Sequence, residues 1–206
     1  MAITYTTKLE AINTMLSAVG SSPVSTLTGQ QTADAVLAQN ILDEVTREVL
    51  SQGWAFNYER KVELTPDSEN QIVLGIDVAR IDNTPGYNMD YDVVQRGPKL
   101  YDRKSHSYTI SETLTCDVIY FMEFDETPEA SRRYMMIRAA RIFQDRMVGS
   151  GNHHTYNMTD EIKALTDLKE HEGDTADHSI FDNHDVFRII DRPTALRSNS
   201  SIGTLS

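Results

Sequence analysis

Four carboxylates stand close together in this sequence, and paired carboxylates are the groups that a glycoside hydrolase uses. They are Glu123, Asp125, Glu126 and Glu129. Two such groups can act as acid and base, or as acid and nucleophile, on either side of a glycosidic bond. The same residues also precede an expected helix, where negative charge stabilises the helix N-terminus. We interpret the cluster as charge at a helix start and keep a glycan hydrolase as the alternative.

Histidine, cysteine and glycine residues give no stronger indication of catalysis. His153 and His154 are adjacent, so their side chains point apart, which is typical of surface residues rather than metal ligands. The single cysteine, Cys116, excludes an intramolecular disulfide and a cysteine-rich zinc site. The glycines are isolated, which argues against a phosphate-binding loop. We predict a protein that is not an enzyme and that has no cofactor or metal.

Composition restricts the class of partner. The chain has 206 residues, 39% of them hydrophobic, which is enough for a core. Its net charge of −12 argues against tight DNA binding, which depends on Lys and Arg neutralising phosphates. An acidic surface could instead line a passage through which DNA slides. The chain lacks an apolar run long enough for a membrane span, and residues 1–5 do not resemble a signal peptide, so we expect folding in a cytoplasm.

Four segments have apolar residues at helical spacing, at about 7–19, 32–52, 127–148 and 155–171. Thr7 and Glu10 fit a capping box at the first helix. At the third, we expect Thr127 to cap the helix and Pro128 to occupy its first position. The arginines of this third helix predict ion pairs between helices or between subunits; they are Arg132, Arg133, Arg138, Arg141 and Arg146.

The segment around Trp54 separates the helical pattern from a β pattern. Gly53 stands where a helix commonly ends in a left-handed residue. Trp54 and Phe56 would point the same way if the chain were extended here. We predict that Gly53, Trp54 and Phe56 form a domain-junction anchor that holds a β module against a helical one, with ordinary core packing as the simpler alternative.

Short β-prone runs separated by Gly, Pro, Asn and Asp occupy residues 57–124. They include 71–74, 108–110 and the clearest one, 114–121, in which Cys116 is expected to be a small buried residue. The fold class predicted is therefore α+β, a four-helix bundle with an inserted small antiparallel β domain and an extended C-terminal arm. The expected parts are a helical domain in two halves (1–56 and 125–172), the β domain (57–124) and the arm (173–206).

The arm is polar but carries an apolar cluster that it cannot easily bury by itself. A polar segment with spaced apolar and arginine residues is typical of an arm that orders on a partner, and a simple disordered tail is the alternative. We predict that the binding residues of this arm are Phe181, Val186, Phe187, Arg188, Ile189, Ile190 and Arg192.

The order of these elements resembles the tail tubular protein A family, the head-to-tail adaptor of T7-like short-tailed phages. The resemblance rests on residues 16–27, 52–57, 100–105 and 125–129 together with 138–143, which keep their order along the chain. It extends over about residues 7–150 and is poor after Gly149.

The resemblance implies a structural virion protein of the tail, assembled in the host cytoplasm. Members form a ring, typically a dodecamer, between the portal protein ring and the tail nozzle, which is a tubular protein B-like partner, near the tail fibres. The ring continues the DNA channel, and DNA passes through it without specific binding. The resemblance further implies that the C-terminal arm binds the portal and that no membrane is involved. The alternatives are a virion-associated glycan hydrolase and a cytoplasmic helical binding protein unrelated to virions.

Overall fold

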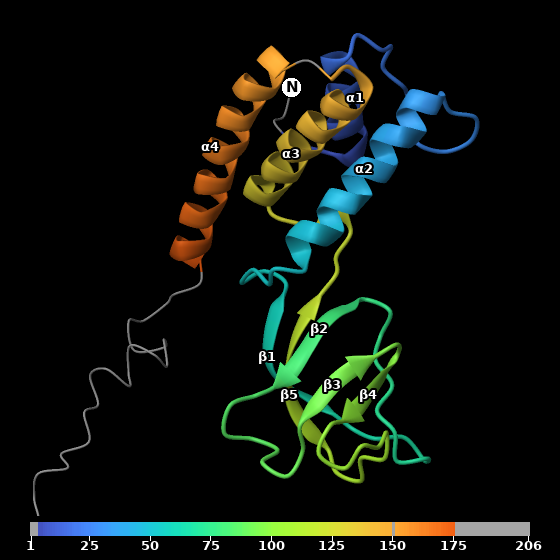
Figure 1. Ribbon diagram of the computed structural model, residues 1–206, viewed down its shortest axis with the longest axis vertical. Coiled ribbons are helices and arrows are strands. Elements are labelled where there is room, and N and C mark those ends of the chain that lie inside the picture. Colours follow the sequence, from blue (N-terminus) through green and yellow to red (C-terminus); the bar gives the residue numbers. More distant parts are fainter. Residues whose placement is uncertain (1–3, 150, 176–206) are drawn as a thin grey trace, which may run out of the picture.

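The computed structural model describes residues 4–149 and 151–175, apart from the side chains of 151–157 and of Thr175. Figure 1 shows helices at one end of the molecule and strands at the other. The chain crosses between the two parts twice, at residues 51–57 and 121–123, and we call these crossings the waist. The strands are thus inserted between the second and third helices, as the sequence pattern predicted.

The helical part contains α1 (Lys8–Ala18), α2 (Ala33–Leu50), α3 (Glu129–Met147) and α4 (Gly151–Thr175). Helix α3 is central, because it packs against each of the other three. Their apolar faces enclose one core, in which the largest fully buried side chains are Phe124, Phe143, Ile12, Met15, Leu16, Ile41 and Leu42. In the described part of the chain, the helices are too short or too polar to cross a membrane.

Helix starts follow the local sequence, with one exception. The predicted capping box of α1 is present: the Glu10 amide donates to Thr7 Oγ1 at 3.2 Å, and the Thr7 amide donates to the Glu10 carboxylate at 2.9 Å. The prediction for α3 was wrong, because Pro128 is the N-cap residue and Glu129 is the first helical residue. The Thr127 hydroxyl is unavailable as a cap because it donates to the carbonyl of Phe124 at 2.9 Å.

The strands form two small antiparallel sheets. The first has the order β1 (Tyr58–Leu64), β5 (Leu114–Tyr120) and β2 (Val78–Asn83), and the second pairs β3 (Val93–Arg96) with β4 (Lys99–Asp102). Predicted strands at 71–74 and 108–110 are absent as such: Val73 makes only an isolated bridge to Lys99. Both segments instead follow irregular paths, with Ile72 and Ile110 buried in the core.

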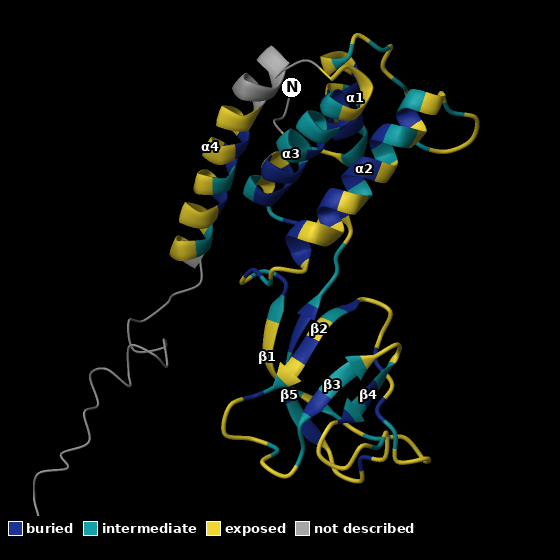
Figure 2. Ribbon diagram, in the orientation of Figure 1, coloured by how far each residue is buried: buried dark blue, intermediate teal, exposed yellow. Residues whose placement is uncertain are grey.

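The β part has a core of its own, separate from the helical one (Figure 2). Alternation along β5 buries Cys116 and Val118, as predicted for this strand. Burial, aided by the nearby Asp117 and Asp82 carboxylates, raises the pKa of the Cys116 thiol to about 11. The thiol therefore stays protonated and packs as a small apolar group.

Candidate functional site

The waist is the first candidate, since the predicted anchor residues lie there. Trp54 is buried and belongs to the helical core, and its indole N–H donates to the carbonyl of Val49 at 2.8 Å. Phe56 is partly buried against the same core. The condition for the two rings to point the same way, an extended chain, is not met: the chain turns here, and the backbone N–H of Asn57 donates to the Trp54 carbonyl at 3.0 Å. Both rings thus pack with the helices, and a role in holding the β part remains a prediction.

Asn57 makes the contacts that cross the waist. Its side-chain amide donates to the carbonyl of Leu50 at 2.8 Å and to the carbonyl of Tyr120 at 2.7 Å. Its side-chain oxygen accepts the backbone N–H of Trp54 at 2.8 Å. Asn57 is 3% exposed, so these bonds form away from water, where an unpaired polar group is costly. Sequence reasoning missed this role because a lone Asn after a helix also fits an ordinary turn.

Two structural constraints favour glycine at position 53. Its φ of +80° lies in the left-handed region, as predicted for a residue after a helix end. In addition, a Cβ at this position would lie 2.4 Å from Cδ1 of Ile119, which is buried in β5. The close approach of these two residues brings the end of α2 against the end of the central strand.

Three of the four carboxylates in the cluster before α3 accept hydrogen bonds from the chain itself. Glu129 accepts the Thr6 amide at 2.8 Å and the Thr6 hydroxyl at 2.6 Å, and Asp125 accepts the Lys8 amide at 2.8 Å. Glu126 accepts the backbone N–H of Glu123 at 3.1 Å. These bonds fasten the entry of α1 to the start of α3, which explains the acidic residues without a reaction.

Arg132 also fastens the entry of α1 to the start of α3. It is 8% exposed, and its guanidinium donates to the carbonyls of Thr127 at 2.7 Å, of Thr6 at 2.9 Å and of Asp125. These acceptors are all backbone oxygens, and Arg132 forms no ion pair with the described residues, contrary to the sequence prediction. A planar fork of donors suits this task, because it satisfies three carbonyls on two segments at once.

Three other arginines of α3, Arg138, Arg141 and Arg146, do form ion pairs between helices, as predicted, whereas exposed Arg133 pairs with no acidic residue in the described part of the chain. Arg138 contacts Glu48 of α2 and Glu161 of α4, each at 2.6 Å. Arg141 also binds Glu161, and Arg146 binds a further acidic residue of α2, Glu44, at 3.2 Å. The group formed by Glu48, Arg138, Arg141 and Glu161, here called the arginine network, therefore links α2, α3 and α4.

Glu161 is the centre of the arginine network. It is 8% exposed, and burial alone would raise the pKa of its carboxyl, but the hydrogen bonds and charges of Arg141 and Arg138 lower the pKa below its usual value. Burial alone would lower the pKa of Arg138, but its hydrogen bonds to Glu48 and Glu161 raise it. Glu161 thus stays ionised and holds α4 on α3. Its position on a long polar helix gave no signal in the sequence.

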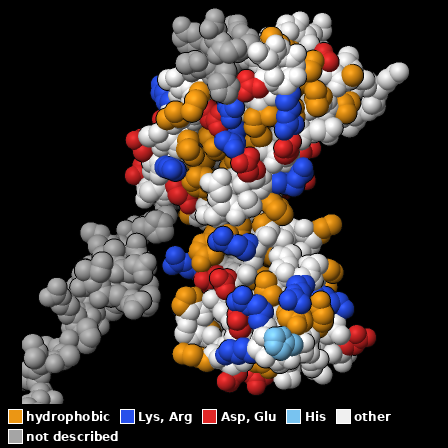
Figure 3. Space-filling model, in the orientation of Figure 1, with side chains coloured by type: hydrophobic (Ala, Val, Ile, Leu, Met, Phe, Trp, Pro, Cys, Tyr) orange, Lys and Arg blue, Asp and Glu red, His pale blue; other side chains and the backbone are white. Residues whose placement is uncertain are grey.

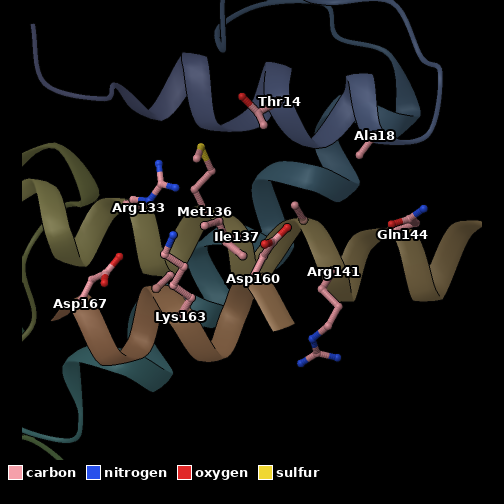
Figure 4. Close-up of a pocket in the computed structure, with 12 residues that line it drawn as sticks. Thr14, Ala18, Arg133, Met136, Ile137, Arg141, Gln144, Asp160, Lys163 and Asp167 are labelled. Atoms are coloured by element: carbon pink, nitrogen blue, oxygen red, sulfur yellow. The ribbon is translucent and has the colours of Figure 1, made fainter. Parts of the chain in front are cut away.

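A groove lies over α3, between α1 and α4, with a volume of about 260 Å³. Figure 4 shows Thr14 and Ala18 of α1 on one side and Asp160, Lys163 and Asp167 of α4 on the other. Met136 and Ile137 of α3 form its apolar floor, beside Arg133. Charges of both signs around an apolar floor suit a polypeptide contact better than a reaction, since this lining lacks a nucleophile paired with a base.

The remaining candidates fall partly outside the described residues. His153 and His154 lie in α4, in the stretch whose side chains are not described. Among the residues that are described, three or more His, Cys, Asp or Glu do not come together in a way that could hold a metal ion. The predicted arm residues, from Phe181 to Arg192, all lie outside the described part of the chain.

The described polar side chains bond to other segments of the same chain, and the described surfaces remain available to partners. Both features are typical of a structural component. The model of the tail tubular protein family matches residues 9–178, and the chain belongs to this family. It is accordingly a structural component of a phage tail. No curated protein matches the chain.

Proposed function

We propose that this tail tubular protein is the head-to-tail adaptor of a T7-like short-tailed phage. The observation that carries the proposal is the family match over residues 9–178, which includes both the helical part and the inserted sheets. As an adaptor, the chain would form a homo-oligomeric ring, a dodecamer, between the portal protein and the tail nozzle. The ring would be assembled in the host cytoplasm as part of the virion.

The two-part fold supports this arrangement. The helical part has its own core and the arginine network, so it can pack side by side in a ring as a rigid body. The β part has a second core and hangs from the waist, so it can project toward the nozzle and the tail fibres. The net charge of −12 suits a channel that DNA crosses during ejection without binding.

We further propose that the C-terminal arm binds the portal ring. Its residues Phe181, Val186, Phe187, Arg188, Ile189, Ile190 and Arg192 would order on that partner. Ordering on a partner would make ring assembly depend on the portal, because the entropy cost of ordering is offset only when the portal is present. A glycan hydrolase receives no support, since Asp125 accepts a hydrogen bond from Lys8 and Glu129 accepts hydrogen bonds from Thr6.

The test is electron microscopy of the purified chain with and without the portal ring of its phage. We expect an added ring-shaped layer on the portal and no ring from the chain alone. Rings formed without the portal would contradict templating while leaving the adaptor role intact. A chain that forms no ring and does not bind the portal would overturn the proposal.

Two further measurements separate the parts of this proposal. Deleting residues 173–206 should abolish portal binding and leave the circular dichroism and melting of the rest unchanged, and retained binding would contradict the role of the arm. The intact chain should show no salt-sensitive affinity for duplex DNA. Binding at moderate salt would contradict passage without binding.

A further inference from the structure

The outer face of the β3–β4 sheet carries two cationic side chains beside an aromatic and an apolar one. Antiparallel pairing places Val94 opposite Tyr101 and Arg96 opposite Lys99, so these four side chains share one face. The alternate residues of β4, Leu100 and Asp102, are buried on the other face. We call Val94, Arg96, Lys99 and Tyr101 the β3–β4 outer face.

Aromatic rings hold the arginine of this face in place. The guanidinium carbon of Arg96 lies 3.6 Å from the centre of the Tyr101 ring, a close cation–π contact. Tyr101 in turn meets Tyr108 edge-on, with 5.0 Å between the ring centres. Stacking on Tyr101 orients the guanidinium plane of Arg96 but occupies none of its N–H groups. These N–H donors are therefore exposed, oriented and available to an acceptor.

The charges of this face are not neutralised within the described part of the chain. There, Arg96 forms no ion pair, and Lys99 donates its ammonium hydrogen to the amide oxygen of Gln71 at 2.6 Å. The contrast with neighbouring Arg103, which pairs with Asp92 at 2.7 Å, is clear. Figure 3 shows Lys and Arg side chains interleaved with hydrophobic ones on this side of the β part. A surface with cations that lack acidic partners is unusual in a chain whose net charge is −12.

Apolar groups flank the two cations. Val73, which bridges to Lys99, is 56% exposed, and Tyr108 is 40% exposed. Exposed apolar groups beside unpaired cations are typical of a protein interface, in which aromatic and arginine side chains contribute most of the affinity. The row of alternating side chains along two strands matches the repeat of an extended polypeptide.

We propose that the β3–β4 outer face binds an extended acidic polypeptide segment of another tail protein. A carboxylate of that segment would accept two parallel N–H bonds from Arg96, and a second carboxylate would pair with Lys99. An apolar side chain between them would lie on Tyr108 and Val73. Duplex DNA is a poorer match, because a chain of net charge −12 repels a dense line of phosphates more strongly than a few carboxylates.

The test measures fluorescence anisotropy of a fluorescein-labelled glutamate–tyrosine copolymer titrated with the full chain at low salt. We expect saturable binding that Arg96→Glu weakens by about tenfold or more, since the bidentate pair is lost. The matched control is Arg60→Glu, another exposed arginine of the β part, stacked on Tyr58. Both variants change the net charge equally, so a difference between them reports the site and not general repulsion.

Each outcome of this titration either supports or overturns the proposal. Absence of binding, or equal weakening by Arg96→Glu and Arg60→Glu, would overturn the proposal. So would equal affinity for a labelled duplex DNA, which would indicate a general polyanion surface. If Arg96→Glu does not fold, Lys99→Glu serves as the second variant, with folding checked by its melting temperature. Binding of such a segment needs neither the ring nor the portal, so its failure would leave the adaptor role untouched.

Discussion

Asn57 and Tyr120, 63 residues apart in the sequence, hold each other through two hydrogen bonds at the waist. The side-chain amide of Asn57 donates to the Tyr120 carbonyl at 2.7 Å, and the backbone N–H of Tyr120 donates to the Asn57 carbonyl at 2.9 Å. The same amide also reaches the last residue of α2, Leu50, at 2.8 Å. One side chain thus connects the end of a helix, the start of β1 and the end of β5, between two separate cores.

Replacing Asn57 with alanine should destabilise the whole chain. The substitution leaves the carbonyls of Leu50 and Tyr120 and the N–H of Trp54 without their partner, and each such buried group costs about 1–3 kcal/mol. Urea unfolding should show a loss of at least about 2 kcal/mol. The matched control is Asn40→Ala at an exposed position of α2, with an expected change within about 0.5 kcal/mol. Equal effects of the two substitutions would contradict a structural role for Asn57.

The contact of Gly53 with Ile119 can be measured separately from the backbone conformation of Gly53. Gly86 has a similar φ of +84° with no atom within 4 Å of its added Cβ, so Gly86→Ala reports the backbone term alone. Gly53→Ala should cost about 1–3 kcal/mol more, from crowding of the Ile119 Cδ1 atom. In a double-mutant cycle, Ile119→Val deletes that atom and should remove most of this excess. A cycle without coupling would show that Ile119 moves aside freely.

Trp54→Ala tests the anchor directly. Truncation of a large buried aromatic residue costs about 3–5 kcal/mol, and here the indole bond to Val49 is lost as well. Phe56→Ala should cost less, because Phe56 is only partly buried. Since Trp54 is the only tryptophan, unfolding must be followed by circular dichroism. An unchanged melting midpoint for Trp54→Ala would refute the anchor.

Local patterns in the sequence predicted the helices and the insertion of the sheets well. The capping box at Thr7 and the buried face of β5 depend on residues near in sequence, and both were found as expected. The strands at 71–74 and 108–110 were wrong because short apolar runs also occur where irregular chain covers a core. The cap at Thr127 was wrong because a preceding turn takes its hydroxyl.

Contacts between distant segments could not be predicted from spacing. Asn57 with Tyr120, Glu129 with Thr6 and Glu161 with Arg138 all join residues whose pairing depends on the packed fold. The sequence indicated that the arginines of α3 would find acidic partners, but not which ones. It also could not show that the acidic cluster before α3 fastens the start of the chain.

Glu161→Gln should weaken the attachment of α4 to α3 while leaving the rest of the chain folded. The amide cannot form ion pairs with Arg138 and Arg141, and because these arginines are partly exposed we expect a cost of about 1–3 kcal/mol. Hydrogen exchange of the α4 amides should report it, with Glu170→Gln on the exposed side of α4 as the control. The folded-state pKa of Glu161 is lowered, so its stabilising effect is present above the ordinary value near 4.5 and is lost as pH falls below it. The variant should lack this acid-dependent loss of α4 protection.

Asp102 makes a second pH-dependent contribution, in the β part. Its carboxylate is 2% exposed, yet it accepts hydrogen bonds from the Ser105 hydroxyl at 2.6 Å and from the amides of Asp92 at 2.9 Å, Lys104 at 3.1 Å and Ser105 at 3.0 Å. Burial alone would raise the pKa, but these bonds lower it to about 2, from an ordinary value of 3.8.

The folded chain therefore binds fewer protons at Asp102 than the unfolded chain does between about pH 4 and pH 2, so acid favours unfolding in that window. The difference between the two pKa values corresponds to at most about 2 kcal/mol of stability at neutral pH. Asp102→Asn should lower the melting temperature at pH 7 and flatten its decrease between pH 4 and pH 2. The control is Glu112→Gln, an exposed carboxylate of the β part, which should keep the wild-type pH profile. If Asp102→Asn also keeps that profile, the turn after β4 does not depend on an ionised Asp102.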